Sequence, residues 1–178
     1  MSIAFCKTRA SRAGLRQDPR SFFLIMYTYD SVDIDSGGNV MQETHYSLFP
    51  LGFLRSPLKD RGAAPNQGRE GAPDAWLEVH ATVAEGLEGI EVGDELIVIT
   101  WLHQAGRDIL KTHPRNDETR PLVGVFATRS PDRPNPLGLH RVTVREIAGK
   151  SVKVGPIEAI DGTPVVDIKP VLSPPADC

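Results

Sequence analysis

Residues 124–144 read GVFATRSPDRPNPLGLHRVTV, and this stretch guides the interpretation of the whole chain. Its apolar start, Val125 to Ala127, predicts a strand, and an alternation of apolar and polar residues resumes at Val142. Between these two parts lie three prolines, Pro131, Pro134 and Pro136. Each proline fixes its own φ and lacks an amide donor, so they predict a stiff loop outside any sheet or helix. A stiff loop holds polar side chains in fixed directions, as a binding site requires.

The polar residues of this proline loop include Arg129, Arg133 and Asn135. A well-ordered surface loop between two strands would explain the prolines alone. The arginines and the asparagine among them favour a functional loop, because binding residues concentrate in loops.

The composition is that of an ordinary globular protein with a local excess of positive charge. A chain of 178 residues is long enough for one domain with a proper core. The net charge is -3, yet residues 103–145 carry eight Lys/Arg against four acids, a local charge of +4. Such a segment can bind phosphates, although a solvated charged face explains it at least as well.

The cysteines and histidines indicate neither a disulfide framework nor a metal site. Cys6 and Cys178 lie near the two ends of the chain, and His103, His113 and His140 are not at metal-ligand spacing. A reducing, cytoplasmic compartment fits this cysteine usage best. No apolar run approaches the roughly 18 residues of a membrane span, so we expect no membrane association. Because the histidines and cysteines are not at metal-ligand spacing, we also expect no metal.

The first 44 or so residues differ in composition from the rest. Residues 1–20 carry five basic residues and a single acid. An organelle transit peptide is one interpretation, and we favour a disordered extension or a start assigned too early, with Met26 or Met41 as the true start. We therefore expect an extension over 1–44, one domain over 45–172 and a tail over 173–178.

Short strands separated by loops with Gly and Pro are predicted from Tyr46 onward. The predicted strands are 48–54, 76–83, 95–102, 125–127, 139–147, 151–157 and 165–168, with one or two helical turns at 105–110. An antiparallel sheet of this size must hide its edges. We therefore expect an all-β fold, a small closed antiparallel β-barrel of about seven strands with short helical insertions. A two-sheet sandwich is the alternative.

Polar clusters follow several of the predicted strands, namely Asn66–Gln67, His103–Gln104, Arg129–Asn135 and Glu158–Asp161. Strand ends of a barrel gather on two rims, so clusters distant in sequence can converge. The chain has no GxSxG, CxxC or HExxH motif and no GxGxxG after a strand. This inventory fits a reaction that depends on positioning better than one that needs a special nucleophile.

Several ordered motifs resemble one family. GVFATRSPDRPNPLGLHRV, IEAIDGTPVVDIKP, LGFLRSP, PNQG and WLHQAGRD are similar in order and spacing to the TsaA/TrmO family, over about residues 51–170. The resemblance implies a small β-barrel protein that binds S-adenosylmethionine between two subunits of a homodimer. It also implies methyl transfer to N6 of threonylcarbamoyladenosine beside the anticodon of tRNA. The family's loop usually reads PRQ, and Asn66 stands here in place of the arginine.

The resemblance also implies roles for individual residues. Cofactor contacts would fall on Asn66, Gln67, His103, Arg129, Arg141, Ile157, Glu158 and Ile160. A planar guanidinium such as that of Arg129 matches the methionine carboxylate, and Glu158 could hold the ribose hydroxyls or the amino end. Contacts to tRNA would fall on Arg133, Asn135, Arg145 and Lys169, with Arg141 also near the tRNA backbone.

Asp161 is the candidate general base that would take the proton from the methylated nitrogen. An aspartate that caps the DGTP turn through its own backbone is the favoured interpretation of this residue. Two further functions stay open beside a tRNA methyltransferase. The same barrel could methylate a different acceptor, which Asn66 leaves open, or it could be a non-enzymatic module that binds S-adenosylmethionine or RNA.

Overall fold

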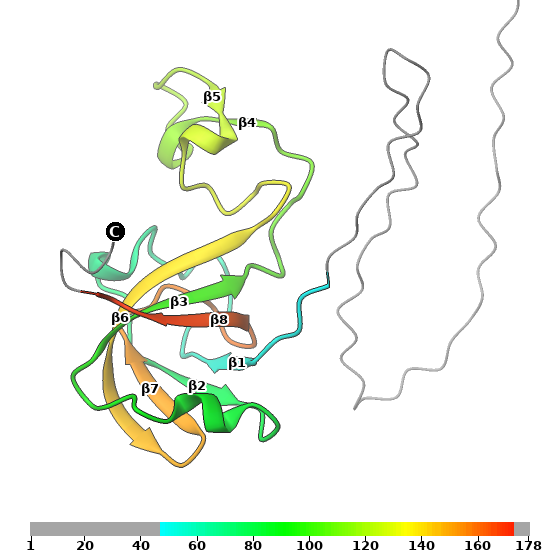
Figure 1. The fold of residues 1–178 in the computed structure, drawn as a ribbon. Helices are drawn as coiled ribbons and strands as arrows, with labels where there is room; N and C mark the ends of the chain where they lie inside the picture. Colours follow the sequence, from blue (N-terminus) through cyan, green and yellow to red (C-terminus); the bar gives the residue numbers. More distant parts are fainter. Residues whose placement is uncertain (1–46, 173–178) are drawn as a thin grey trace, which may run out of the picture. The chain divides into compact units, whose positions relative to one another are not determined.

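The computed structural model describes residues 47–172, a part of the chain built from short strands and 3-10 helices (Figure 1). The strands are β1 (Gly52–Arg55), β2 (Ala75–Val79), β3 (Glu95–Trp101), β4 (Lys111–Thr112), β5 (Val123–Gly124), β6 (Leu137–Ala148), β7 (Ser151–Gly155) and β8 (Pro164–Pro170). The helices are η1 (Gly68–Glu70), η2 (Ala84–Leu87), η3 (Pro114–Asn116) and η4 (Val125–Ala127). The predictions made for residues 1–44 and 173–178 lie outside the described residues.

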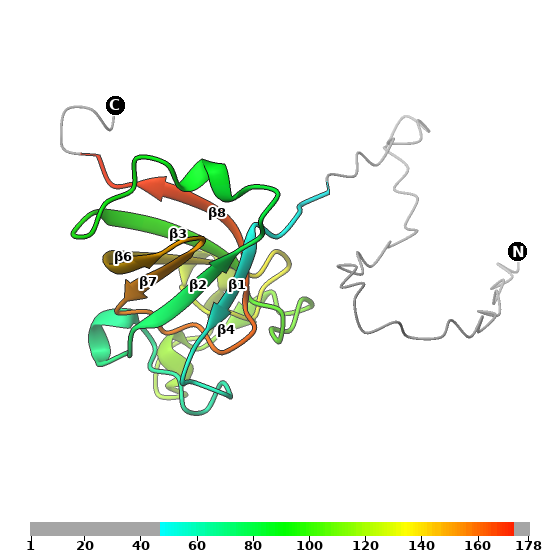
Figure 2. The same cartoon turned by 90° about the horizontal axis from the view of Figure 1, so that it is seen from below.

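Six strands form one antiparallel sheet whose order, β1-β2-β7-β6-β3-β8, closes into a ring. The ring closes because β8 pairs with β3 on one edge and with β1 on the other (Figure 2). Val165 of β8 lies opposite both Gly52 of β1 and Thr100 of β3. The prediction of an all-β chain with short helical insertions is therefore confirmed. Within residues 47–172, the structure has no helix of the length and apolarity that a membrane crossing needs.

The ring contains six strands rather than about seven, because residues 125–127 form η4 instead of a strand. Side chains of the proline loop take up the carbonyls that a strand would offer to a neighbour. The Thr128 hydroxyl donates to the Val125 carbonyl at 2.8 Å, and Arg133 Nη2 donates to the Thr128 carbonyl at 2.7 Å. The turns predicted at 105–110 are not helical, since the Gly106 amide donates to the Asp132 carboxylate.

The interior of the ring follows the two-residue period of its strands. Alternate residues of β3 and β6, such as Val98 and Val142, are buried, while their neighbours face outward. The core cluster is apolar throughout and consists of Leu54, Ala75, Leu77, Val79, Leu96, Val98, Val142, Val144, Val152, Val154, Ile157, Ala159 and Val165. Burial of this apolar face supplies the main driving force for closing the ring.

The loops that carry the predicted site residues leave from one end of the ring. At this end, which we call the site rim, β1, β3 and β7 end and β2, β6 and β8 begin. Three long loops leave from it, residues 56–74, 102–136 and 156–163.

Strand β6 has an unusual environment near the site rim. Its residues 137–143 pair with β3 on one edge, whereas pairing with β7 on the other edge begins only at Thr143. On that open side, η1 of the first loop contacts β6. The start of β6 therefore faces loops rather than a strand, and a site can form there.

Close approach of β1 to β2 requires a glycine at position 52. A Cβ at Gly52 would collide with the Glu78 carbonyl of β2. We expect Gly52→Ala to lower the free energy of unfolding by about 1–3 kcal/mol, the usual effect of overpacking. Urea unfolding measures this loss. Gly86→Ala is the matched control, because a Cβ there meets no atom within 4 Å. Equal stability of the two variants would contradict the prediction.

Candidate functional site

The predicted site residues separate into two groups in the structure. The first group lies in the loops of the site rim and consists of Asn66, Gln67, His103, Arg129, Arg133, Asn135, Ile157, Glu158, Ile160 and Asp161. Those of the strands, Arg141, Arg145 and Lys169, lie on the exposed outer surface of β6 and β8. The predicted convergence of distant polar clusters on one rim therefore matches the topology for the loop residues.

The buried polar side chains of the described part also gather at the site rim. Within residues 47–172 they are Ser56, Thr100, His140 and Thr163, each at most 4% exposed. Ser56 follows β1, Thr100 is the penultimate residue of β3, His140 lies in the first part of β6 and Thr163 precedes β8. Because a buried polar group costs free energy unless it is paired, their concentration at one end indicates a specialised region.

A buried histidine connects β3 to the last of the three rim loops. His140 Nε2 lies 2.9 Å from the Thr100 hydroxyl, inside the ring. Its other nitrogen, Nδ1, lies 3.0 Å from Glu158 Oε1, at an angle too oblique for a full hydrogen bond. Apart from this nitrogen, Trp101 Nε1 is the one buried side-chain polar atom in the described part without a hydrogen-bond partner. Trp101 ends β3 at the site rim, where a bound ligand could satisfy Nε1, whereas His140 Nδ1 faces Glu158.

Glu158 is held as a carboxylate. Burial alone would raise its pKa, but His140 and the backbone amides of Glu158 and Gly68 outweigh burial and leave the pKa below 4.5. The side chain is 22% exposed, so this negative charge is accessible from the rim. Gly68 of the PNQG loop must be a glycine at this point, because a Cβ would lie 2.8 Å from the Pro156 carbonyl.

Asp132 ties the proline segment to the loop after β1 and to the start of its own loop. Its Oδ2 pairs with Arg61 Nη2 at 2.7 Å, and its Oδ1 accepts from the Gly106 amide at 2.7 Å. Arg61 also donates to the Gln104 carbonyl at 3.1 Å. Burial would raise the pKa of Asp132, but Arg61 and the Gly106 amide lower it. These contacts, together with the prolines, fix the loop that carries Arg129.

The predicted basic residues differ in how far they are free to bind a ligand. Arg129 is exposed and makes no hydrogen bond or ion pair within residues 47–172. Arg133 is engaged by its own loop, where it donates to the Ser130 and Thr128 carbonyls. Each of the three predicted cations on the strands has a carboxylate neighbour: Arg141 with Glu95 at 2.7 Å, Lys169 with Asp167 at 2.8 Å and Arg145 with Asp74 at 4.0 Å.

Asp161 has a structural role in the loop before β8. One oxygen accepts from the Ser56 amide at 3.0 Å, and the other pairs with Lys59 at 3.0 Å. The Lys59 ammonium and then the Ser56 amide lower its pKa. The favoured interpretation placed this carboxylate on its own DGTP turn, but both of these bonds lead to the loop after β1. Its role as a general base stays a prediction.

The remaining predicted residues are spread over the rim. His103 follows β3 and is exposed. Partial burial of its ring nevertheless lowers its pKa. Asn66 and Asn135 are exposed, and Gln67 is half-buried. The side chains of Ile157 and Ile160 are buried, the first in the core cluster. Any ligand contact of Ile157 would therefore involve its backbone.

Sequence reasoning did not select Thr100 and His140 as site residues. The signal was available in the alternation of β6, where His140 has the same parity as the buried Val142 and Val144. An inward histidine in an otherwise apolar strand needs polar partners, which are Thr100 and Glu158.

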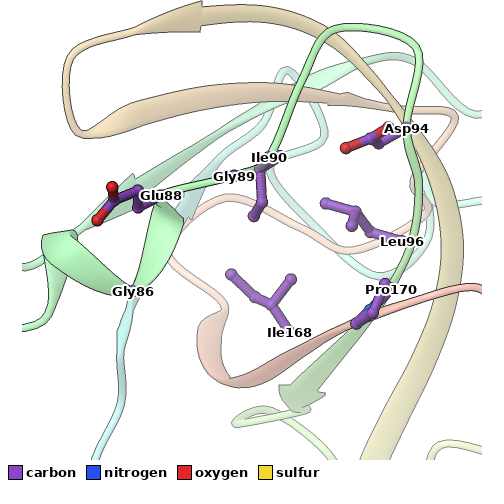
Figure 3. A pocket seen from close by; sticks show the side chains of 8 residues that line it. All are labelled: Gly86, Glu88, Gly89, Ile90, Asp94, Leu96, Ile168 and Pro170. Carbon is purple, nitrogen blue, oxygen red and sulfur yellow. The ribbon is translucent and has the colours of Figure 1, made fainter.

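A cavity lies at the opposite rim, away from the predicted site. Its volume is about 280 Å³, and Ile90, Leu96 and Ile168 point into it (Figure 3). Two carboxylates, Glu88 and Asp94, lie at its edge. None of the predicted site residues lines it. Within residues 47–172 no group of three His, Cys, Asp or Glu is arranged to hold a metal ion.

Comparisons with known proteins agree on one family. The family described as tRNA-methyltransferase O N-terminal domain matches residues 53–178. A probable S-adenosyl-L-methionine-binding protein of Archaeoglobus fulgidus is 46% identical over 71% of this chain and 34% of its own length. The probable S-adenosyl-L-methionine-binding protein VirR of Rhizobium radiobacter is 40% identical over 72% of this chain and 73% of its own.

A solved structure supports the same relationship. TrmO from Pseudomonas aeruginosa has a TM-score of 0.61 and 31% identity, over 77% of this chain and 59% of its own. The chain thus spans about a third of the archaeal relative and less than two thirds of the Pseudomonas protein.

The lowered pKa of Glu158 predicts a pH-dependent contribution to stability. Since its folded pKa lies below 4.5, the stabilisation is present above that value and is lost as pH falls through the folded pKa. We expect Glu158→Gln to cost about 1–3 kcal/mol at pH 7, with the difference from wild type vanishing in acid. Urea unfolding between neutral and acidic pH measures both. Glu146→Gln, at an exposed position of β6, should show no such closing difference.

Proposed function

The chain belongs to the family of tRNA-methyltransferase O N-terminal domains, and on this basis we propose that it is an S-adenosylmethionine-dependent methyltransferase. The cofactor would bind at the site rim, among the loops that carry Gln67, His103, Arg129 and Glu158. The observation that supports this most is the Glu158 carboxylate, buried enough to be positioned and kept negative by His140 and the Gly68 amide.

The donor groups of the rim fit the charges of this cofactor. S-adenosylmethionine carries a carboxylate, an ammonium, a sulfonium and an adenosine with ribose hydroxyls. Arg129 offers an exposed planar guanidinium for the carboxylate. Glu158 offers an anionic acceptor for the ammonium or the ribose hydroxyls. The unpaired Trp101 Nε1 is one further donor at this end of the ring.

When bound, the cofactor supplies an electrophilic methyl group for in-line transfer to a nucleophile. The protein positions the reactants and supplies a fixed electrostatic environment. Among the described residues of the rim we recognise no catalytic nucleophile. Holding donor and acceptor in reactive geometry can remove roughly 7–11 kcal/mol of a bimolecular barrier. The Arg61–Asp132 pair serves this purpose by fixing the loop of Arg129 against the loop after β1.

We further propose that the acceptor is N6 of threonylcarbamoyladenosine beside the anticodon of tRNA. The family assignment supports a tRNA substrate, and the exposed basic residues Arg141, Arg145 and Lys169 give the outer surface cations for phosphates. A phosphate would have to displace Glu95 from Arg141 and Asp167 from Lys169. Asp161 stays our candidate for the proton acceptor, together with Asn135 and Arg133 as residues near the substrate.

A homodimer with the cofactor near the subunit interface is part of the proposal. Large apolar side chains are exposed beside the site: Leu137 and Leu139 on the outer face of β6, and Phe126 of η4 at 76% exposure. A second copy of the chain that covered these residues would remove them from water. We also place the protein in the cytoplasm, where its tRNA substrate and reduced cysteines would be found.

A second candidate function shares the same cofactor site. Asn66 is exposed in the PNQG loop, where the family usually has an arginine, and the rim therefore lacks one cation. The curated relatives are named for S-adenosylmethionine binding and not for an acceptor. These observations favour methylation of a different acceptor, or binding without catalysis, as the alternative.

Removal of the exposed guanidinium tests the cofactor site. We expect wild-type protein to bind S-adenosylmethionine in calorimetry and Arg129→Ala to bind it more weakly by about 1.5–3 kcal/mol, the range of a charged hydrogen bond. Lys150→Ala, at the β6–β7 turn away from the site rim, serves as the control and should bind as wild type does. Unchanged affinity of Arg129→Ala would remove this residue from the site, and no affinity of the wild type would refute the function.

Mass spectrometry of tRNA nucleosides tests the acceptor. After incubation of tRNA with protein and S-adenosylmethionine, we expect threonylcarbamoyladenosine to gain the mass of one methyl group. A reaction without cofactor and a reaction with tRNA that lacks this nucleoside are the controls. If the protein binds the cofactor but the nucleoside stays unchanged, the acceptor is a different one and the alternative function holds.

A further inference from the structure

Thr100 and His140 form a buried polar pair to which the proposed reaction gives no role. Thr100 is fully buried and His140 is 4% exposed, so neither side chain is positioned to touch a large ligand. Away from the buried polar residues near the site rim, the core cluster of the ring is apolar. Burying an imidazole and a hydroxyl among valines costs free energy unless their contacts compensate for it. Thr100 contacts His140, and His140 contacts Glu158. These contacts therefore indicate a role beyond packing.

The chemistry of these groups fixes the direction of their hydrogen bonds. An ionised carboxylate only accepts, so the imidazole nitrogen that faces Glu158, Nδ1, must carry the proton. In the neutral ring, Nε2 is then an acceptor, and the Thr100 hydroxyl at 2.9 Å is its donor. The chain of donors thus runs from Thr100 through His140 to Glu158. The Glu158 carboxylate selects the tautomer, and the Thr100 hydroxyl supports it by donating to Nε2.

The backbone around the pair preserves this arrangement. Gly138 lies opposite Thr100 in the pairing of β3 with β6. A Cβ at Gly138 would lie 2.5 Å from the Thr100 hydroxyl and 2.6 Å from His140 Nε2. Glycine at this position therefore leaves the space in which the hydroxyl and the ring meet. On the other side, Glu158 is 22% exposed and lies next to Gly68 of the PNQG loop.

We propose that Thr100 and His140 are positioning residues that orient the Glu158 carboxylate toward the cofactor. This inference rests on the proposed function, since it takes Glu158 as a cofactor contact. The buried pair anchors one carboxylate oxygen inside the ring, and the carboxylate then presents its remaining acceptor capacity to the rim. The oblique approach of His140 Nδ1 to Glu158 Oε1 is expected to straighten when a ligand engages the carboxylate.

The first test measures the tautomer in the protein without cofactor. Nitrogen-15 NMR of the histidine rings should show His140 protonated at Nδ1 and unprotonated at Nε2, and Thr100→Val should alter the Nε2 signal. Thr143→Val, on β6 but outside the pair, is the matched control and should leave both signals in place. A ring protonated at Nε2 alone would overturn the inference, and this measurement needs only the unchanged chain.

The second test measures coupling by calorimetry with S-adenosylmethionine. We expect Thr100→Val to weaken binding about three- to tenfold, the effect of losing one hydrogen bond, and Thr100→Ser to restore most of the affinity. In a Glu158→Gln background, Thr100→Val should add little further loss, because the residue acts through Glu158. An equal loss in both backgrounds, or none in either, would overturn the inference while the proposed function stands. No binding by the wild type would refute the proposed function itself, and the inference with it.

Discussion

The pairing of β8 with two partners is the constraint on which the other features depend. β8 pairs with β3 along most of its length and with β1 at its start, and this double pairing closes the ring. Closure fixes both the height and the angular position of each strand end. Loops that are far apart in the sequence then share one rim, and small ties between them suffice to hold a site.

The distribution of polar groups follows from this closure. The ring interior is apolar except near one end, where Ser56, Thr100, His140 and Thr163 are buried. The Glu158 carboxylate lies at the same end. The loops that Asp132 links also leave from this end. On the outer surface most charges are paired in exposed ion pairs, which contribute little to stability. Arg129 differs from them because it has no such neighbour in the described part.

Much of the fold was predictable because its strands follow simple patterns. The alternation at 76–83 and the apolar run at 95–102 correspond to β2 and β3, with ends that differ by up to four residues. The run at 125–127 was misleading, because three apolar residues cannot establish a period. Its conformation depends on Arg133 and Thr128, whose side chains bind local carbonyls. Pattern alone does not reveal such a tertiary preference.

The site was predictable in its loops and not in its interior. Strand ends and polar clusters located Gln67, His103 and Glu158, since these depend only on where strands stop. The contact of His140 with Glu158 joins β6 to the loop after its neighbour β7. The parity of His140 indicated its inward direction, but the partner that it meets there emerges only from three-dimensional closure.

The order of residues along β6 gives the fold little tolerance for error. His140 faces inward and Arg141 outward, and Val142 follows inward again. A slip of β6 by one residue would exchange the two faces and place a guanidinium inside the ring, where no carboxylate of β3 or β7 could neutralise it. A misaligned β6 is thus heavily penalised by its own charge. His140, which faces the site, and Arg141, which faces solvent, therefore also fix the register of β6 in the sheet.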